Sequence, residues 1–248
     1  MKSCLFALSI GLSLLMANAS QAADMKAFVT GAAKRYYDAI IPQFEKSGGH
    51  KVTTEFGLPP ALIKKMEAGE PFDVLILSYD VEGLIKQGKL VADSRTVLGR
   101  TGVGVAIRKG SPKPDFSTVE KFKTMLLNAK SFATSGQGSS GRYVDGLIDR
   151  LGISQVKAKI KSGDSGAAGR LLSNGEVDFV VSGLPPLIGT PNIEWLGEIP
   201  AEINSSVVFT GGINAHAKEP QAARTLLQFL TTPAAVAVWK ENGLEPAR

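Results

Sequence analysis

The chain has 248 residues, of which 44% are apolar, 21% charged and 7% aromatic. These proportions are ordinary for one or two globular domains and exclude a disordered or collagen-like chain. The formal net charge is +5, from 28 basic and 23 acidic side chains. Because acidic residues lie between the basic ones along the whole chain, we expect no nucleic-acid partner.

The first residues have the pattern of a secretory signal peptide. Lys2 gives a positive start, residues 4–16 are mostly apolar, and small residues follow up to Ala22. The apolar run is shorter than the ~20 residues that cross a bilayer, and no longer run follows. A buried N-terminal helix is the alternative, which the charged start and the small-residue exit disfavour. We therefore predict that residues 1–22 are removed, with Ala19 as the alternative cleavage site, and that the protein is periplasmic.

The single cysteine, Cys4, lies in this leader, so the predicted mature chain has no disulfide and no thiolate ligand. The two histidines, His50 and His216, stand apart from each other and from any acidic cluster. We therefore expect neither a metal nor another cofactor. His50 follows two glycines and is predicted to lie in a solvated turn, whereas His216 is predicted to lie in a loop.

Strands and helices alternate along the rest of the chain, as short apolar runs and apolar residues at helical spacing indicate. The predicted strands are 27–30, 51–56, 73–77, 102–107, 131–134, 178–181 and 206–209. The predicted helices are 32–44, 61–67, 81–87, 118–128, 142–151, 167–173, 219–230 and 233–241. This alternation is typical of open parallel sheets with right-handed crossovers.

The order of these elements predicts an α/β fold of two lobes, the second inserted into the first. Lobe 1 would comprise residues 23–102 and 207–248, and lobe 2 residues 103–206. The chain would then cross between the lobes twice, through two hinge strands.

Ligands of open α/β sheets bind outside the carboxyl ends of the strands, where helix N-termini carry partial positive charge. The loops predicted there are small and polar, which suits a small anion. The predicted ligand-binding residues are Thr30, Gly31, Ala32, Ser78, Ser139, Ser140, Arg142, Tyr143, Ser165 and Ser182. Helix capping is the alternative role of Thr30, Ser139, Ser140 and Ser165.

The glycine-rich loop 135–143 carries the most informative pattern. Its glycines let the backbone approach a ligand, and Arg142 offers two parallel hydrogen bonds to a carboxylate. A cation in the first turn of a helix opposes the helix dipole, so an anion beside Arg142 would stabilise it there. A solvated Arg142 is the alternative. The glycine spacing formally matches a dinucleotide fingerprint, but no acidic strand end follows about 20 residues later, so we expect no nucleotide.

Two stretches resemble the family of periplasmic molybdate-binding proteins of ABC importers. They are residues 66–78, with the sequence MEAGEPFDVLILS, and residues 230–246, which begin LTTPAA. The resemblance extends over essentially the whole predicted mature chain. It implies a type II periplasmic binding protein, with an anion held between the lobes by loop N–H groups and hydroxyls. It also implies an inner-membrane ABC permease as partner, and we expect a monomer.

This sequence differs from that family at the positions that bind the anion. The family's oxyanion-binding serines are replaced by Ala32 or Ala33 and by the stretch 58–60, and the stretch 182–183 stands where a tyrosine is expected. Proline lacks an N–H, and a desolvated tetrahedral dianion needs many converging donors. We therefore expect a small organic anion with a carboxylate rather than molybdate or another tetrahedral oxyanion.

The same broad family includes aconitate isomerase, an exported enzyme that interconverts cis- and trans-aconitate. A proton-shift isomerase on this fold is therefore the alternative to a binding protein, since fold alone does not distinguish the two. Such a reaction needs a positioned acid or base. Lys34, Tyr143, Asp164 and Ser182 are candidates, and the sequence singles out none of them.

Overall fold

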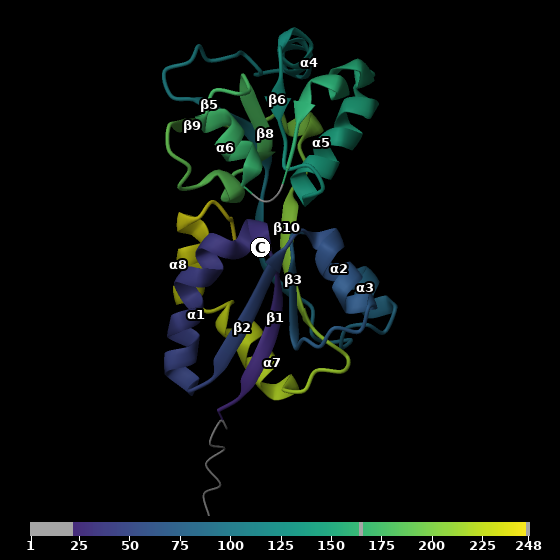
Figure 1. Ribbon diagram of the computed structural model, residues 1–248, viewed down its shortest axis with the longest axis vertical. Helices are drawn as coiled ribbons and strands as arrows, with labels where there is room; N and C mark the ends of the chain where they lie inside the picture. Colours follow the sequence, from purple (N-terminus) through teal and green to yellow (C-terminus); the bar gives the residue numbers. More distant parts are fainter. Residues whose placement is uncertain (1–21, 164–165, 247–248) are drawn as a thin grey trace, which may run out of the picture.

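The structure, a computed structural model, describes residues 22–163 and 166–246. The predicted signal peptide up to residue 21, the candidate base Asp164 and the predicted site residue Ser165 lie outside these ranges. Two five-stranded sheets form two lobes, one below the other in Figure 1. The predicted two-lobed α/β fold is confirmed.

The first sheet has the strand order β2-β1-β3-β10-β4. Its strands are β1 (Asp24–Thr30), β2 (Lys51–Gly57), β3 (Val74–Leu77), β4 (Thr96–Thr101) and β10 (Val207–Ile213). β1 pairs parallel with β2 and β3, while β10 pairs antiparallel with β3 and β4. All four residues of β3 are buried, as expected for a parallel strand covered on both faces.

The second sheet has the order β7-β6-β8-β5-β9. Its strands are β5 (Val103–Arg108), β6 (Phe132–Ala133), β7 (Ile160–Lys161), β8 (Phe179–Gly183) and β9 (Ile193–Glu198). β6 pairs parallel with β7 and β8, and β5 pairs antiparallel with β8 and β9. Each sheet is therefore a parallel trio extended by an antiparallel strand and an edge strand.

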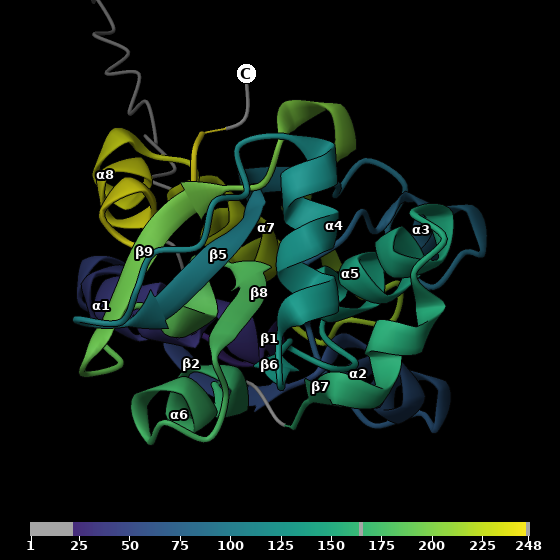
Figure 2. The ribbon, with the colours of Figure 1, turned by 90° about the horizontal axis from the view of Figure 1, so that it is seen from above.

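Helices cover both faces of both sheets. The α-helices are α1 (Lys34–Gly48), α2 (Pro59–Glu67), α3 (Glu82–Lys86), α4 (Val119–Asn128), α5 (Ser139–Arg150), α6 (Ala167–Ser173), α7 (Pro220–Phe229) and α8 (Pro233–Glu241). The short 3-10 helices are η1 (Gly31–Ala33), η2 (Ser154–Lys159), η3 (Pro185–Leu187) and η4 (Ala201–Ile203). One core joins the first sheet to α1, α7 and α8, and another joins it to α2 and α3. Figure 2 shows α4 and α5 on one side of the second sheet and α6 on the other.

Within the described residues, no helix combines the length and apolar character needed to cross a bilayer.

The chain passes between the sheets twice, from β4 into β5 and from β9 into β10 (Figure 1). Glu198 links these two crossings. Its carboxylate accepts hydrogen bonds from the Gly102 N–H at 3.1 Å and from Asn204 Nδ2 at 2.8 Å. Asn204 Oδ1 in turn accepts from the Val103 N–H at 3.0 Å. The two crossings are thus held side by side at the base of the second sheet.

Every predicted helix and strand is present, but the strands β4, β7 and β9 were not predicted. β4 and β9 are edge strands in which half of the residues of β4 and all of those of β9 are at least partly exposed, so no apolar run marks them, and β7 has only two residues. His50 is also not solvated, contrary to the prediction. It is 4% exposed, its ring stacks on Phe44 at 5.2 Å, and its Nδ1 accepts from the Ala23 N–H.

Candidate functional site

The two lobes meet where parallel strands of both sheets end. Thr30 ends β1 and Ser78 follows β3 in one lobe, whereas Ser135 follows β6 and Gly183 ends β8 in the other. All four residues line one cavity of about 30 Å³. The loops at the carboxyl ends of the strands in both lobes therefore converge on one space.

A row of hydroxyl groups crosses this cavity from one lobe to the other. The Oγ atom of Ser78 lies 3.3 Å from Oγ1 of Thr30 and 2.8 Å from Oγ of Ser139. Thr30 and Ser78 belong to the first lobe, and Ser139 begins α5 in the second. The hydrogen bond between Ser78 and Ser139 thus joins the lobes directly.

A second row of hydroxyl groups lies within the second lobe. The Oγ atom of Ser140 is 2.7 Å from Oγ of Ser135 and 3.3 Å from Oγ of Ser182. These three side chains are at most 9% exposed, so their hydroxyls are removed from bulk water. Hydroxyls can donate or accept, and both rows can therefore turn their O–H groups toward a bound anion. We call the space lined by Thr30, Ser78, Ser135, Ser139 and Ser140 the hydroxyl cavity.

The hydroxyl cavity also has an apolar lining. Its apolar lining residues are Ala32, Leu58, Pro185, Pro186, Val207 and Phe209. Phe209 is 1% exposed and packs edge-on against Tyr36, with ring centroids 6.0 Å apart. The lining therefore offers hydrogen bonds through its hydroxyls, which we call the polar wall, and apolar surface through these side chains, which we call the apolar wall.

The hydroxyl cavity is nearly closed in this structure. A volume of about 30 Å³ holds about two water molecules. The Ser78–Ser139 hydrogen bond and the contact between η1 and η3 bring the lobes together. Any ligand larger than a few atoms therefore requires movement of side chains or of the lobes.

The N-terminus of α5 points its first turn at the hydroxyl cavity. The Arg142 N–H bonds the Gly138 carbonyl at 3.0 Å, which makes Gly138 the N-cap and leaves the amides of residues 139–141 at the open end of the helix. Gly136 has φ +52°, and a Cβ at Gly141 would overlap the Gly136 backbone. The glycines of this loop are therefore required for its own packing. Backbone N–H groups and the helix dipole both favour negative charge there.

Arg142 lies outside the hydroxyl cavity, in an adjoining outer recess of about 530 Å³. Its guanidinium carbon is 5.5 Å from the centre of the Tyr79 ring, which belongs to the other lobe. Tyr143 also lines the outer recess, and its hydroxyl donates to the carbonyl of Ile203. Both residues thus face the space between the lobes rather than the outer surface of lobe 2.

The structure brings most of the predicted site residues together. Thr30, Ala32, Ser78, Ser139 and Ser140 line the hydroxyl cavity. Ser182 is fully buried and does not line the cavity, but its hydroxyl is hydrogen-bonded to that of Ser140, which does. Gly31 begins η1 beside the cavity without lining it, and Ser165 lies outside the described residues.

Several lining residues were missed by the sequence reasoning. Ser135 is the clearest case, because it directly follows a predicted strand in the glycine-rich loop and could have been selected on that ground. Thr101, Val207 and Phe209 come from the crossing strands β4 and β10. Val207 and Phe209 are apolar and Thr101 stands alone in the sequence, so no sequence pattern marks them as ligand-binding residues.

Two ionisable side chains that line the outer recess, Tyr79 and Asp80, have shifted pKa values. Burial raises the pKa of the Tyr79 hydroxyl, although the nearby Arg142 cation lowers it. Arg95 donates two hydrogen bonds to Asp80, at 2.9 and 2.5 Å, and these lower the pKa of that carboxyl. Lys34, a candidate base, pairs with Asp38 at 2.7 Å.

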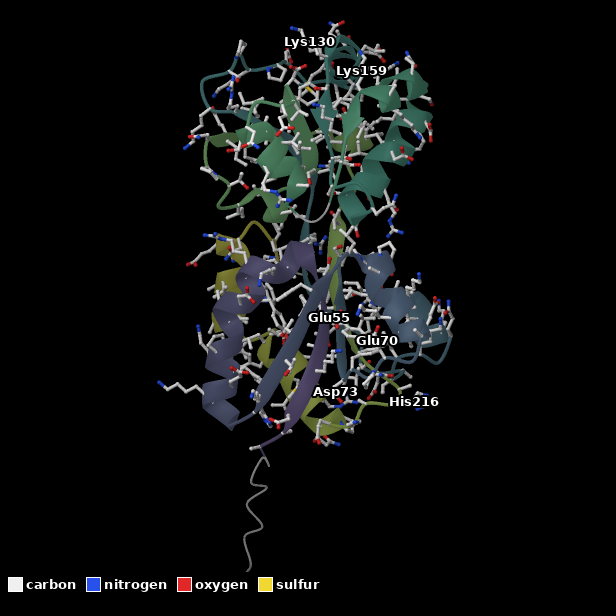
Figure 3. The ribbon with its side chains drawn as sticks, viewed as in Figure 1. Glu55, Glu70, Asp73, Lys130, Lys159 and His216 are labelled. Carbon is white, nitrogen blue, oxygen red and sulfur yellow. The ribbon has the colours of Figure 1, made fainter. Side chains whose placement is uncertain are left out.

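Asp73 and His216 lie far from the site. Figure 3 shows Asp73 and His216 near the end of the first lobe that is remote from the second. The buried carboxylate of Asp73 accepts hydrogen bonds from the N–H groups of Lys26, Lys218 and Glu219, so it fixes the start of α7. Neither side chain can reach a ligand in the hydroxyl cavity.

Comparison with known proteins agrees with this architecture. A profile of the family described as bacterial extracellular solute-binding protein matches residues 25–245. The chain is 29% identical to an aconitate isomerase from a Pseudomonas species over 215 residues, which cover 84% of this chain and 82% of that protein. It is 28% identical to the molybdate-binding protein ModA of Azotobacter vinelandii over 242 residues, 92% of each chain. The solved periplasmic molybdate-binding protein of Azotobacter vinelandii superposes with a TM-score of 0.73 at 20% identity, covering 90% of this chain and 100% of that one. The resemblance predicted from the sequence is confirmed.

Proposed function

The chain belongs to the family of bacterial extracellular solute-binding proteins, and we propose that it captures a small organic anion with a carboxylate in the hydroxyl cavity. The observation that carries this proposal is the mixed lining of the cavity. Hydroxyls and the start of α5 form the polar wall, and apolar side chains that include Phe209 and Val207 form the apolar wall.

The polar wall suits the charged end of such a ligand. Ser78, Ser139 and Ser140 can each donate an O–H to a carboxylate, and hydrogen bonds to a charged group contribute about 1.5–3 kcal/mol each. The open amides of α5 add to this, because an anion at a helix N-terminus is stabilised by the dipole.

The apolar wall suits a carbon skeleton. Covering apolar surface contributes roughly 25 cal/mol per Å², and only a ligand with apolar atoms of its own gains fully from contact with Phe209, Val207 and Leu58. Molybdate or sulfate presents oxygen on every side, so those side chains would face its oxygens without hydrogen bonds. The lining thus favours an organic anion over a tetrahedral oxyanion.

We place the moving parts in two lobes, residues 23–102 with 207–248 and residues 103–206. The strands of each sheet fall within these ranges, and the two crossings meet at Glu198 and Asn204. Bending at the crossings would open the hydroxyl cavity, as in hinge closure around a ligand. Delivery to an inner-membrane ABC permease from the periplasm would follow, after removal of residues 1–22.

Isomerisation of an unsaturated tricarboxylate is the second candidate, favoured by the 29% identity with an aconitate isomerase. The described lining residues of the hydroxyl cavity offer hydroxyls and backbone amides but no carboxylate, imidazole or amine. This set suits holding an anion better than moving a proton near neutral pH.

A panel of ligands tests the proposal. Purified protein is melted with molybdate, sulfate, acetate, succinate, citrate, cis-aconitate and trans-aconitate at equal ionic strength. A ligand at 100 times its Kd adds about 2.7 kcal/mol of stability, so a bound carboxylate raises Tm visibly. We expect carboxylates to raise Tm and the tetrahedral oxyanions to leave it unchanged. The reverse pattern would contradict the proposal.

Two variants and an incubation complete this experiment. Ser139→Ala removes a lining hydroxyl and is expected to weaken carboxylate binding about tenfold, a loss of roughly 1.4 kcal/mol. Ser154→Ala removes a surface hydroxyl bonded to Asp149 and should bind as the wild type does. Separate incubations with cis- and trans-aconitate, followed by chromatography, decide between the two functions, since conversion would establish an isomerase.

A further inference from the structure

The hydroxyl cavity is too small to hold a whole organic ligand, so the rest of the ligand must extend into a neighbouring space. The outer recess shares Ser78, Ser139 and Val207 with it as lining residues. The Ser78–Ser139 hydrogen bond is therefore the partition between a space of about 30 Å³ and one of about 530 Å³.

A second hollow, of about 550 Å³, meets the hydroxyl cavity at Thr101 on the side of the crossings. Among the residues up to Pro246 that the structure describes, its ionisable lining residues are Glu198, Lys240 and Glu245, two carboxylates against one amine. Negative charge on a ligand is disfavoured there. The outer recess is the more favourable exit for an anion.

The charge of the outer recess is set by Arg142. Its other charged lining residue, Asp80, is already paired with Arg95 through two hydrogen bonds. Tyr79 lies under the guanidinium at 5.5 Å and stays neutral, because burial raises the pKa of its hydroxyl. The Arg142 cation also opposes the dipole of α5, so an anion in the recess would relieve that cost.

We infer that the ligand carries at least two carboxylates on a short carbon chain, one in the hydroxyl cavity and the other against Arg142. This inference rests on the proposed function and deepens it. The ligand would pass between Ser78 and Ser139, whose hydroxyls would bond its first carboxylate in place of each other. Closing the lobes would then bring Tyr79 and Arg142 together over the second carboxylate, one from each lobe.

Calorimetry with propionate, succinate and tricarballylate tests this at constant ionic strength, with the full chain. The wild type should bind succinate at least tenfold more tightly than propionate, because Arg142 adds a bidentate, charge-assisted contact. Arg142→Gln should remove this gain, about 10–100-fold for succinate, and leave propionate affinity within about twofold.

Arg150→Gln is the matched control. Arg150 lies on the same helix and stacks on Tyr143 at 5.3 Å, as Arg142 stacks on Tyr79, but it lies about 12 Å further along α5. The Arg150→Gln variant should bind all three ligands as the wild type does. Melting curves check that both variants fold. Equal succinate affinity in the wild type and Arg142→Gln overturns the inference, and so does an equal loss for propionate and succinate. If the wild type binds molybdate and no carboxylate, the proposed function fails as well.

Discussion

The two lobes have the same sheet plan but are built differently around the site. In each, a hydroxyl residue of the cavity stands at or just past the end of the central strand of the parallel trio, since Thr30 is the last residue of β1 and Ser135 lies two residues after β6. β1 has seven residues and β6 only two, so the first lobe is the more extensively paired. Both lobes supply hydroxyls to the hydroxyl cavity. Lobe 1 supplies most of its apolar side chains, including Phe209, whereas lobe 2 supplies the N-terminus of α5 to the cavity and Arg142 to the outer recess.

This difference separates two tasks of recognition. Apolar contacts depend on the size and shape of the ligand and act over short distances. Charged donors and a helix dipole depend on where negative charge sits. On this reading lobe 1 selects the carbon skeleton and lobe 2 selects the charge, and variants in one lobe should disturb one property more than the other.

The largest effect is expected from Phe209→Ala in lobe 1. Phe209 is 1% exposed and packs against Tyr36, so truncation leaves a cavity and lowers the free energy of unfolding by about 3–5 kcal/mol. Urea unfolding measures this loss. The control is Leu127→Ala in lobe 2, whose side chain is 38% exposed and which should change stability by less than about 0.5 kcal/mol. A loss below about 1 kcal/mol for Phe209→Ala would mean that this wall is not part of the packed core.

A smaller effect is expected from Gly141→Ala in lobe 2. The added Cβ would overlap the Gly136 backbone, and overpacking of this kind costs about 1–3 kcal/mol. In the same helix, Gly146→Ala meets only the Arg150 guanidinium at 3.5 Å and should stabilise by up to about 1 kcal/mol through helix propensity. Thermal melts of the two variants should therefore move in opposite directions. A shift of the same sign in both would show that the loop adapts freely.

The fold could be predicted largely from local patterns, because each helix and each buried strand leaves its own periodicity. The helix α1, with its apolar residues at helical spacing, is an example. The edge strands β4 and β9 were missed, since half-exposed strands lack that signal. His50 was placed in solvent because its burial depends on Phe44 and on the chain start at Ala23, contacts that no local pattern reports.

The site could be predicted only in its hydroxyl half. Small polar residues after strands mark Thr30, Ser78 and Ser139, whereas Phe209 looks like any core residue in the sequence. The separation of Arg142 from the hydroxyl cavity was also beyond the sequence. It depends on the start of α5 at Ser139 rather than at residue 142, which turns the side chain toward Tyr79 of the other lobe.

Thr30→Val compares a single hydroxyl of lobe 1 with those of lobe 2. The change keeps the shape and removes the hydrogen bond to Ser78, so we expect a loss of about 1 kcal/mol, or fivefold in carboxylate affinity. Calorimetry with succinate measures this loss of affinity. The control is Thr225→Val, which removes an exposed hydroxyl on α7 and should leave the affinity unchanged. A greater loss for Thr30→Val than for Ser139→Ala would reverse the assignment of charge recognition to lobe 2.

The smallest effect is expected from a change of pH, which should leave the succinate affinity nearly constant. Tyr79 remains neutral to high pH because burial raises the pKa of its hydroxyl, and Asp80 remains anionic to low pH because Arg95 lowers the pKa of its carboxyl. The charges of these two side chains are therefore constant between roughly pH 6 and 9, and succinate affinity should vary by less than about twofold. A fall below pH 6 belongs to protonation of the ligand, which loses its second negative charge. Calorimetry at several pH values measures the affinity. A bell-shaped dependence of succinate affinity on pH within this window would reveal a titrating group at the site and favour proton transfer over binding alone.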